Sequence, residues 1–261
     1  MGDITNPVDC QKVISQVDVV CHQAALGSVP RSVADPLKSH DTNVNGFLNM
    51  LNIAKENGIK RFIYASSSSV YGDDTHLPKQ EDIIGKPMSP YAITKYINEL
   101  YAYIFTKLYG MECIGLRYFN VFGPRQNPNG PYAAVIPKFV EALLNGESPV
   151  INGDGSFCRD FTYVNNVVMA NVNALLTDNK ECFGEAFNIG TNNNISILEL
   201  YNLINDYIGN NIKPVFGNTR VGDVPQSLAN IDKAKMMLKY NPTVTLKEGI
   251  IPTIEHFKSN L

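Results

Sequence analysis

The feature that most limits the fold is an alternation of apolar strands with helical patterns in the first part of the chain. The apolar runs VDVVCHQAA (17–25), KRFIYASS (60–67) and MECIGLRYFNVFG (111–123) lack the alternation expected of a half-exposed strand. Between them, residues 43–58 and 91–110 carry apolar side chains at helical spacing. This order predicts βαβ units and an α/β fold, with a parallel sheet covered by helices on both faces.

The amino-acid composition changes after Gly123, where proline, glycine and asparagine become frequent, as in GPRQNPNGPY. Shorter apolar segments follow. We therefore expect two parts within the 261 residues, which is enough chain for a large domain and a smaller lobe. The predicted division is residues 1–120 and residues 121–261, with segments of the second part returning to the first.

Composition excludes several classes of protein. The net charge is −3 and the pI is near 5.8, so no basic surface for nucleic acid is expected. No apolar run approaches the roughly 18 residues of a membrane span. The five cysteines are scattered without a CxxC pair, and the four histidines lack metal-ligand spacing. We expect reduced thiols, a cytoplasmic location and no metal.

Two motifs carry candidate chemistry: YASSSSVYG (64–72) and YAITK (91–95). The serine run is either a flexible polar loop or a row of hydroxyls beside a reacting atom. Tyr91 and Lys95 are four residues apart and share a helix face, where an ammonium lowers the pKa of a phenol and makes it a useful base. YxxxK alone is a weak signal. The serines strengthen it because they follow a predicted parallel strand, at the end where open sheets bind ligands.

The motifs SSSSVYG, SPYAITK and RYFNVFGP, in this order and spacing, resemble the extended short-chain dehydrogenase/reductase family, and more narrowly its NAD-dependent nucleotide-sugar 4-epimerases. The similarity continues through HQAALGSVPRSVADP, VINGDGSFCRDFTYV and RVGDVPQSLAN and covers almost the whole chain. It implies a Rossmann-like doubly wound sheet that binds NAD and a smaller lobe that binds a UDP-sugar. Bacterial UDP-N-acetylglucosamine 4-epimerases of surface-polysaccharide pathways are the most similar in pattern.

The resemblance implies roles for individual residues. Ser67 would hydrogen-bond the sugar 4-hydroxyl, Tyr91 would be the base, and Lys95 would bind the nicotinamide ribose while lowering the pKa of Tyr91. Residues 23–27 would form the loop over the pyrophosphate, where small residues let the backbone approach the cofactor. Besides Tyr91 and Lys95, the implied cofactor contacts are Asp3, Ile4, Gln23, Ala24, Ala25, Leu26, Gly27, Asn43, Ala65, Ser66 and Phe119.

Contacts with the UDP-sugar are implied in the same way. Arg159 and Arg220 would clamp the diphosphate, as planar guanidinium groups do well, and Asp223 would bind a ribose hydroxyl. Ser227 falls where galactose epimerases carry a bulky tyrosine, so the pocket has room for an N-acetyl group. The remaining implied contacts are Ser67, Ser68, Ser69, Asn120, Ala134, Val135, Val150, Ile151 and Asn152.

Purely structural interpretations remain open for several of these residues. Arg159 could pair with Asp160 at the surface, and Asn120 could cap a loop. Tyr118 and Phe119 could be core aromatics, and VINGDG (150–155) could be a hairpin turn.

Related enzymes of the family are the first alternatives in function. Sugar 4,6-dehydratases and UDP-glucuronate decarboxylases carry acidic residues where this chain has Ser68 and Ser69. We therefore expect interconversion of UDP-GlcNAc and UDP-GalNAc. Epimerisation of UDP-GlcNAc-uronate, UDP-glucose or UDP-glucuronate at C4 is the alternative.

The chain contains no GxGxxG turn of the kind that opens a dinucleotide-binding domain. We expect a chain truncated at its N-terminus that retains NAD poorly, and an inactive sugar-nucleotide-binding remnant is a further alternative. The family forms dimers through helices that correspond to residues 43–57 and 91–109, so a homodimer is expected here as well.

Overall fold

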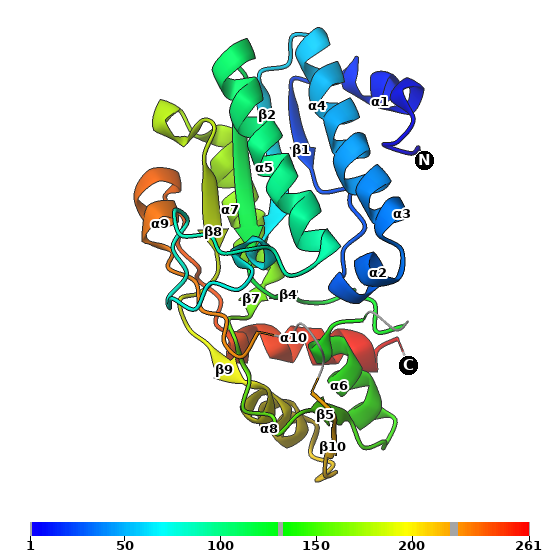
Figure 1. Cartoon of the computed structure of the whole chain (residues 1–261). Helices are drawn as coiled ribbons and strands as arrows, with labels where there is room; N and C mark the ends of the chain where they lie inside the picture. The colour runs from blue at the N-terminus through cyan, green and yellow to red at the C-terminus, as the bar shows by residue number, and fades with distance from the viewer. Residues whose placement is uncertain (1, 130–132, 220–223, 261) are drawn as a thin grey trace.

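The fold is built around a four-stranded parallel sheet (Figure 1). The computed structural model describes residues 2–129, 133–219 and 224–260. The sheet has the strand order β1-β2-β3-β8, and every neighbouring pair is parallel. This confirms the predicted parallel sheet. The strands are β1 (Val19–His22), β2 (Arg61–Ser67), β3 (Glu112–Tyr118) and β8 (Ala186–Ile189).

Helices α4 (Gly46–Glu56) and α5 (Pro90–Tyr109) cover one face of this sheet, and α1 (Pro7–Ile14) packs against α4. Phe47 of α4 and Phe62 of β2 are fully buried and meet edge to face, with 5.7 Å between ring centroids. Aromatic pairs in this geometry favour one packing arrangement. The apolar stripe of residues 43–58 therefore forms the predicted helix against the sheet.

The opposite face is covered by α7 (Val164–Leu176) and α9 (Asp232–Leu238), which come from the second half of the chain. Ala170 of α7 packs with Ile63 and Ile114 in one buried cluster. The sheet is thus enclosed on both faces, which explains why its strands are continuously apolar.

A second group of elements lies below the sheet in Figure 1. Helices α6 (Val135–Leu144), α8 (Ile197–Ile208) and α10 (Leu246–Lys258) enclose an apolar cluster of their own. Three two-stranded sheets accompany them: β4 (Val121–Phe122) with β7 (Thr162–Tyr163), β5 (Val150–Asn152) with β10 (Val215–Gly217), and β6 (Cys158–Arg159) with β9 (Ile195–Ser196). Because β5 pairs in parallel with a strand some sixty residues away, residues 150–155 do not form a hairpin.

Short helices complete the description. Asn6 caps α1 by accepting from the Val8 amide at 3.0 Å, and Pro7 opens the helix. In the described residues, no helix is long and apolar enough to cross a membrane. The short helices are α2 (Val29–Ala34), α3 (Pro36–His40), a π-helical turn (Asp41–Asn45), the 3₁₀ turn η2 (Ser68–Tyr71) and the 3₁₀ turn η3 (Lys180–Cys182).

Candidate active site

The serine run is an ordered turn at the end of β2. The strand stops at Ser67, and the next four residues form η2. Gly72 ends the turn with φ +56°, and a Cβ at this position would overlap the Lys86 carbonyl oxygen. Ser68 and Ser69 therefore lie in a 3₁₀ turn and not on the strand. The interpretation as a flexible loop is wrong.

Helix α5 begins on a well-defined cap. The Ser89 hydroxyl accepts from the Ala92 amide at 3.1 Å, and Pro90 occupies the first helical position. The Tyr91 amide, which the helix itself leaves without a partner, donates to the Ser32 hydroxyl of α2 at 3.0 Å. These contacts fix where Tyr91 and, one turn later, Lys95 leave the helix.

Lys95 and Tyr91 are both deeply enclosed. Lys95 is 2 % exposed, and burial lowers its pKa to about 8, against the opposing charge of Glu99. Its ammonium donates to the Ala65 carbonyl at 2.8 Å and lies 6.0 Å from the centre of the Tyr91 ring. Burial raises the pKa of Tyr91, while a hydrogen bond with Ser67 lowers it. The pKa of Tyr91 is raised on balance, because burial outweighs the hydrogen bond with Ser67, so the expected lowering by Lys95 is not seen.

A cavity of about 850 Å³ joins these residues to the loop after β1. Ser67, Tyr91 and Lys95 all border it, so the structure brings the three expected catalytic residues together. A Cβ on Gly27 would meet no atom within 4 Å, so the backbone there is open to a bound group. The other expected cofactor residues that border this cavity are Gln23, Ala25, Ala65 and Ser66.

Asn43 holds this loop in place. Its side chain accepts from the Leu26 amide at 2.7 Å and donates to the Leu26 carbonyl at 3.1 Å. It also donates to the Thr94 hydroxyl of α5 at 3.2 Å and is 1 % exposed. Asn43 therefore ties the loop to the helix that carries Tyr91. It does not itself border the cavity.

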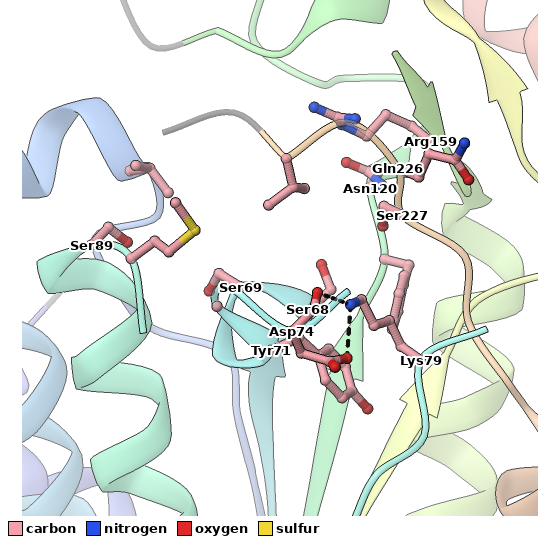
Figure 2. A pocket seen from close by; sticks show the side chains of 15 residues that line it. Ser68, Ser69, Tyr71, Asp74, Lys79, Ser89, Asn120, Arg159, Gln226 and Ser227 are labelled. Atoms are coloured by element: carbon pink, nitrogen blue, oxygen red, sulfur yellow. Dashed lines mark hydrogen bonds and ion pairs between the residues drawn. The ribbon is translucent and has the colours of Figure 1, made fainter. Parts of the chain in front are cut away.

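A second cavity, of about 210 Å³, is bordered by residues of η2 (Figure 2). It gathers five of the expected substrate residues from separate segments. A buried ion pair also borders it: Lys79 donates to the Asp74 carboxylate at 2.8 Å and to the Asp74 carbonyl. This pair was not predictable from the sequence, because it depends on how residues 72–89 fold back. The expected residues are Ser68, Ser69, Asn120, Arg159 and Ser227.

A third cavity, of about 400 Å³, brings together Val135, Val150 and Asn152. Ile151, between the last two, is fully buried and points into the core of the second lobe. Strand alternation explains the difference, since neighbouring side chains face opposite sides. Ala134 directly precedes α6 at the edge of this region.

Several expected residues lie elsewhere. The Asp3 carboxylate accepts from the Thr5 amide and hydroxyl at 2.9 Å each, and neither Asp3 nor Ile4 borders the large cavity. Phe119 is fully buried in the core and borders the second cavity instead. Ala24 and Leu26 do not border the large cavity, and Arg220 and Asp223 lie outside the described residues.

The contacts of Asp160 test two structural interpretations: a surface ion pair with Arg159 and a loop cap by Asn120. It is fully buried and accepts from the Thr191 amide and hydroxyl and from the amides of Asn192 and Ala229, so it is no surface partner for Arg159. The Asn120 amide donates to the Asp160 carbonyl at 2.9 Å, so Asn120 does fasten this loop while it borders the second cavity.

Comparison with known proteins identifies the family. Residues 1–190 match the model of the NAD dependent epimerase/dehydratase family. A putative UDP-glucose 4-epimerase of Methanocaldococcus jannaschii is 40 % identical over 245 residues, which are 94 % of this chain and 78 % of that protein. A UDP-glucuronate 4-epimerase of Thermodesulfobacterium geofontis is 33 % identical over 263 residues, which cover 99 % of this chain and 79 % of that protein.

Solved structures agree with these matches. A UDP-N-acetylglucosamine 4-epimerase from Methanobrevibacter ruminantium, in complex with UDP-N-acetylmuramic acid, has a TM-score of 0.94 and 39 % identity, with 100 % of this chain and 82 % of that one covered. A UDP-glucuronic acid 4-epimerase from Bacillus cereus, with NAD bound, has a TM-score of 0.92 and 32 % identity, with 100 % and 81 % covered. The predicted Rossmann-like fold, family and cofactor are thereby confirmed. The chain belongs to the NAD-dependent epimerase/dehydratase family.

Proposed function

We propose that the chain is a UDP-sugar 4-epimerase that interconverts UDP-N-acetylglucosamine and UDP-N-acetylgalactosamine. The observation that carries the choice of substrate is the second cavity, where Ser227 is small and 7 % exposed. Relatives of similar identity are named as epimerases of UDP-glucose, UDP-glucuronate and UDP-N-acetylglucosamine, which supports the reaction class without selecting the sugar.

Among the described residues that border this cavity, Asp74 is the acidic side chain, and it is a poor proton donor. Although burial acts to raise its pKa, hydrogen bonds from Lys79 and His76 hold that pKa well below the usual range. The serines nearest the reacting hydroxyls carry no carboxyl group. These features favour epimerisation over dehydration, which requires an acid beside the sugar.

The residues present fit NAD in the large cavity. The backbone at Gly27 is open, Ala25 and Ala65 are small, and Lys95 offers a buried ammonium as a donor for ribose hydroxyls. When bound, NAD supplies the hydride acceptor and donor for C4 of the sugar. We propose residues 1–120 as the main cofactor-binding part and 121–261 as the main UDP-sugar-binding part.

The chain's own residues have distinct tasks in this reaction. Tyr91 removes the proton of the 4-hydroxyl and later returns it, and Ser67 hydrogen-bonds the reacting oxygens. Arg159 and Asn120 anchor the diphosphate at the rim of the second cavity. The short hydroxyl side chains of Ser68 and Ser69 leave the sugar free to turn over between the two proton transfers.

A substrate panel tests this function. UDP-GlcNAc, UDP-GalNAc, their uronates and UDP-glucose are incubated with the chain and NAD, and the C4 epimers are separated by chromatography. Tyr91→Phe should lower turnover by roughly 10²–10⁴-fold while the fold remains intact. Ser227→Tyr should reject N-acetylated sugars and spare UDP-glucose. Full activity of Tyr91→Phe contradicts the mechanism, and an equal response of both sugars to Ser227→Tyr contradicts the choice of substrate.

We also propose a homodimer. Helix α5 exposes an apolar stripe of Ile93, Leu100, Ile104 and Leu108, while Leu48 of α4 is half-buried beside it. A stripe of this kind on a folded helix marks an interaction surface. Light scattering should show a dimer that Leu100→Glu with Ile104→Glu converts to a folded monomer. A wild-type monomer at micromolar concentration contradicts the proposal.

A further inference from the structure

Ser67 borders the large cavity, and almost all of the hydrogen bonds that its hydroxyl can make are accounted for. A serine hydroxyl has one proton to donate and two lone pairs to accept with. The Ser69 amide donates to Ser67 Oγ at 3.2 Å, and the Ser69 hydroxyl donates to the same oxygen at 3.0 Å. Both lone pairs of Ser67 are therefore filled by one residue, and only the Ser67 proton is left to direct elsewhere.

The partner for that proton is Tyr91. Both residues border the large cavity, and the pKa of Tyr91 reflects a side-chain hydrogen bond with Ser67. This bond lowers the pKa of Tyr91, which is the effect of a donor that faces the phenolate. From the filled lone pairs and this geometry we propose that Ser69 is a positioning residue, which fixes the Ser67 hydroxyl so that it donates to Tyr91 Oη.

The backbone around Ser69 is suited to this task. Ser69 belongs to η2, where Val70 and Tyr71 are buried and the Gly72 amide donates to the Ser69 carbonyl at 3.2 Å. The hydroxyl of Ser69 is thus held by a rigid turn. Without it, Ser67 Oγ has a free lone pair and can accept the proton of Tyr91 instead of donating its own. That reversed bond stabilises the neutral phenol, which is the wrong form for a base.

The test measures the acidity of residue 91 directly. Tyr91 is replaced by 3,5-difluorotyrosine, whose phenol is more acidic and titrates at milder pH, and its single ¹⁹F NMR signal is followed against pH in the chain without ligand. Ser69→Ala should lower the acid dissociation constant about three- to tenfold, as expected when a hydrogen bond to a charged group is lost. Ser69→Thr keeps the hydroxyl and should restore most of the wild-type value.

A double-mutant cycle shows whether the effect passes through Ser67. Ser67→Ala should lower the acid dissociation constant of residue 91 at least as much as Ser69→Ala does. Adding Ser69→Ala to Ser67→Ala should not change this constant further. Ser259→Ala, in the exposed C-terminal turn, should leave the titration unchanged. An unchanged titration in Ser69→Ala overturns the proposal, as does a full Ser69→Ala effect in the Ser67→Ala background. Because no turnover is measured, these outcomes are independent of the substrate panel.

Discussion

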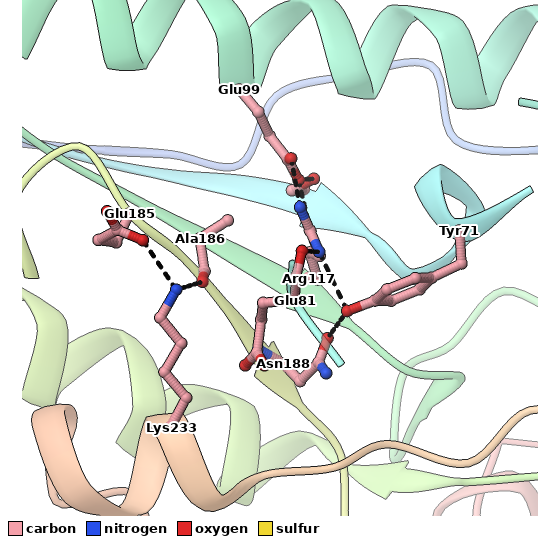
Figure 3. Close-up of polar contacts among 9 residues, drawn as sticks. Tyr71, Glu81, Glu99, Arg117, Glu185, Ala186, Asn188 and Lys233 are labelled. Carbon is pink, nitrogen blue, oxygen red and sulfur yellow. Dashed lines mark hydrogen bonds and ion pairs between the residues drawn. The ribbon is translucent and has the colours of Figure 1, made fainter. Parts of the chain in front are cut away.

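Two buried cations, Arg117 and Lys95, interact with Glu99, and they differ in how well they are paired. Arg117 is 3 % exposed and donates to both carboxylate oxygens of Glu99, at 2.9 and 2.8 Å (Figure 3). It also donates to the Tyr71 hydroxyl at 3.0 Å and the Glu81 carbonyl at 2.9 Å. Although burial alone would lower its pKa, Glu99 raises that pKa, so Arg117 stays charged.

Lys95 is equally buried but less well paired. It donates to a neutral carbonyl, that of Ala65, and Glu99 acts on it through its charge. Burial lowers its pKa to about 8, and the charge of Glu99 opposes this only in part. Arg117 is thus a structural charge whose bonding is satisfied within the protein. Lys95 retains donors for a ligand, and this comes at the expense of stability.

The largest effect that tests this contrast is expected at Arg117. Arg117→Met leaves Glu99 as a buried carboxylate without its ion pair, which should lower the free energy of unfolding by about 3–5 kcal/mol. Urea unfolding followed by circular dichroism measures this loss. The additional change Glu99→Leu should recover part of it, because the uncompensated charge is removed.

The matched control is a surface ion pair. Lys258 and Glu255 lie 2.9 Å apart with side chains 39 % and 51 % exposed, so Lys258→Met should change stability by no more than about 0.5 kcal/mol. If Arg117→Met lowers the free energy of unfolding no more than Lys258→Met does, Arg117 is not a structural charge.

Replacing Lys95 should change the free energy of unfolding in the opposite direction, towards higher stability. A lysine whose pKa is lowered on folding binds fewer protons in the folded than in the unfolded chain, so stability rises as pH increases from about 8 towards the usual lysine pKa of 10.5. Lys95→Met removes the buried charge and one hydrogen bond, and should stabilise the chain by about 2 kcal/mol at pH 7. Turnover should be lost at the same time.

The pH dependence separates this explanation from simple repacking. In urea unfolding between pH 7 and 10.5, the advantage of Lys95→Met should be full below pH 8 and shrink as pH rises through this interval. An advantage that stays constant with pH would mean that better packing, rather than removal of a charge, stabilises the variant.

These contrasts show how far the sequence alone could go. The strands, the helices that bear Phe47 and Tyr91, and the sheet type follow from apolar spacing and helix caps, which are local signals. Ser67, Tyr91 and Lys95 follow from two short motifs at predictable ends of elements. The turn at Ser68 was not predictable from spacing, because Gly72 and its close approach to the Lys86 carbonyl set the end of the strand.

What the sequence could not provide depends on contacts between distant segments. The network around Arg117 joins residues up to 117 positions apart, as between Tyr71 and Asn188. The Asp74–Lys79 pair spans only five positions, but it depends on how the loop between η2 and α5 folds back. The pKa of Tyr91 also required the structure, since burial raises it, a hydrogen bond with Ser67 lowers it, and only geometry decides which effect is larger.

The smallest of these effects is expected at Ser66, which touches Glu99 without carrying charge. Its hydroxyl donates to Glu99 Oε1 at 2.5 Å, on the same oxygen that Arg117 Nε uses. Ser66→Ala should lower the free energy of unfolding by about 1.5 kcal/mol, the value of one hydrogen bond to a charged group. Ser259→Ala serves as the exposed control.

Unlike the Lys95 effect, the loss at Ser66 should be the same at every pH between 7 and 10.5, because a serine has no charge to gain or lose in this range. Urea unfolding at the same series of pH values measures it. A loss that grows or shrinks between pH 8 and 10.5 would show that Ser66 acts on Lys95 through Glu99. The regions around Arg117 and Lys95 would then be a single coupled network rather than two separate environments.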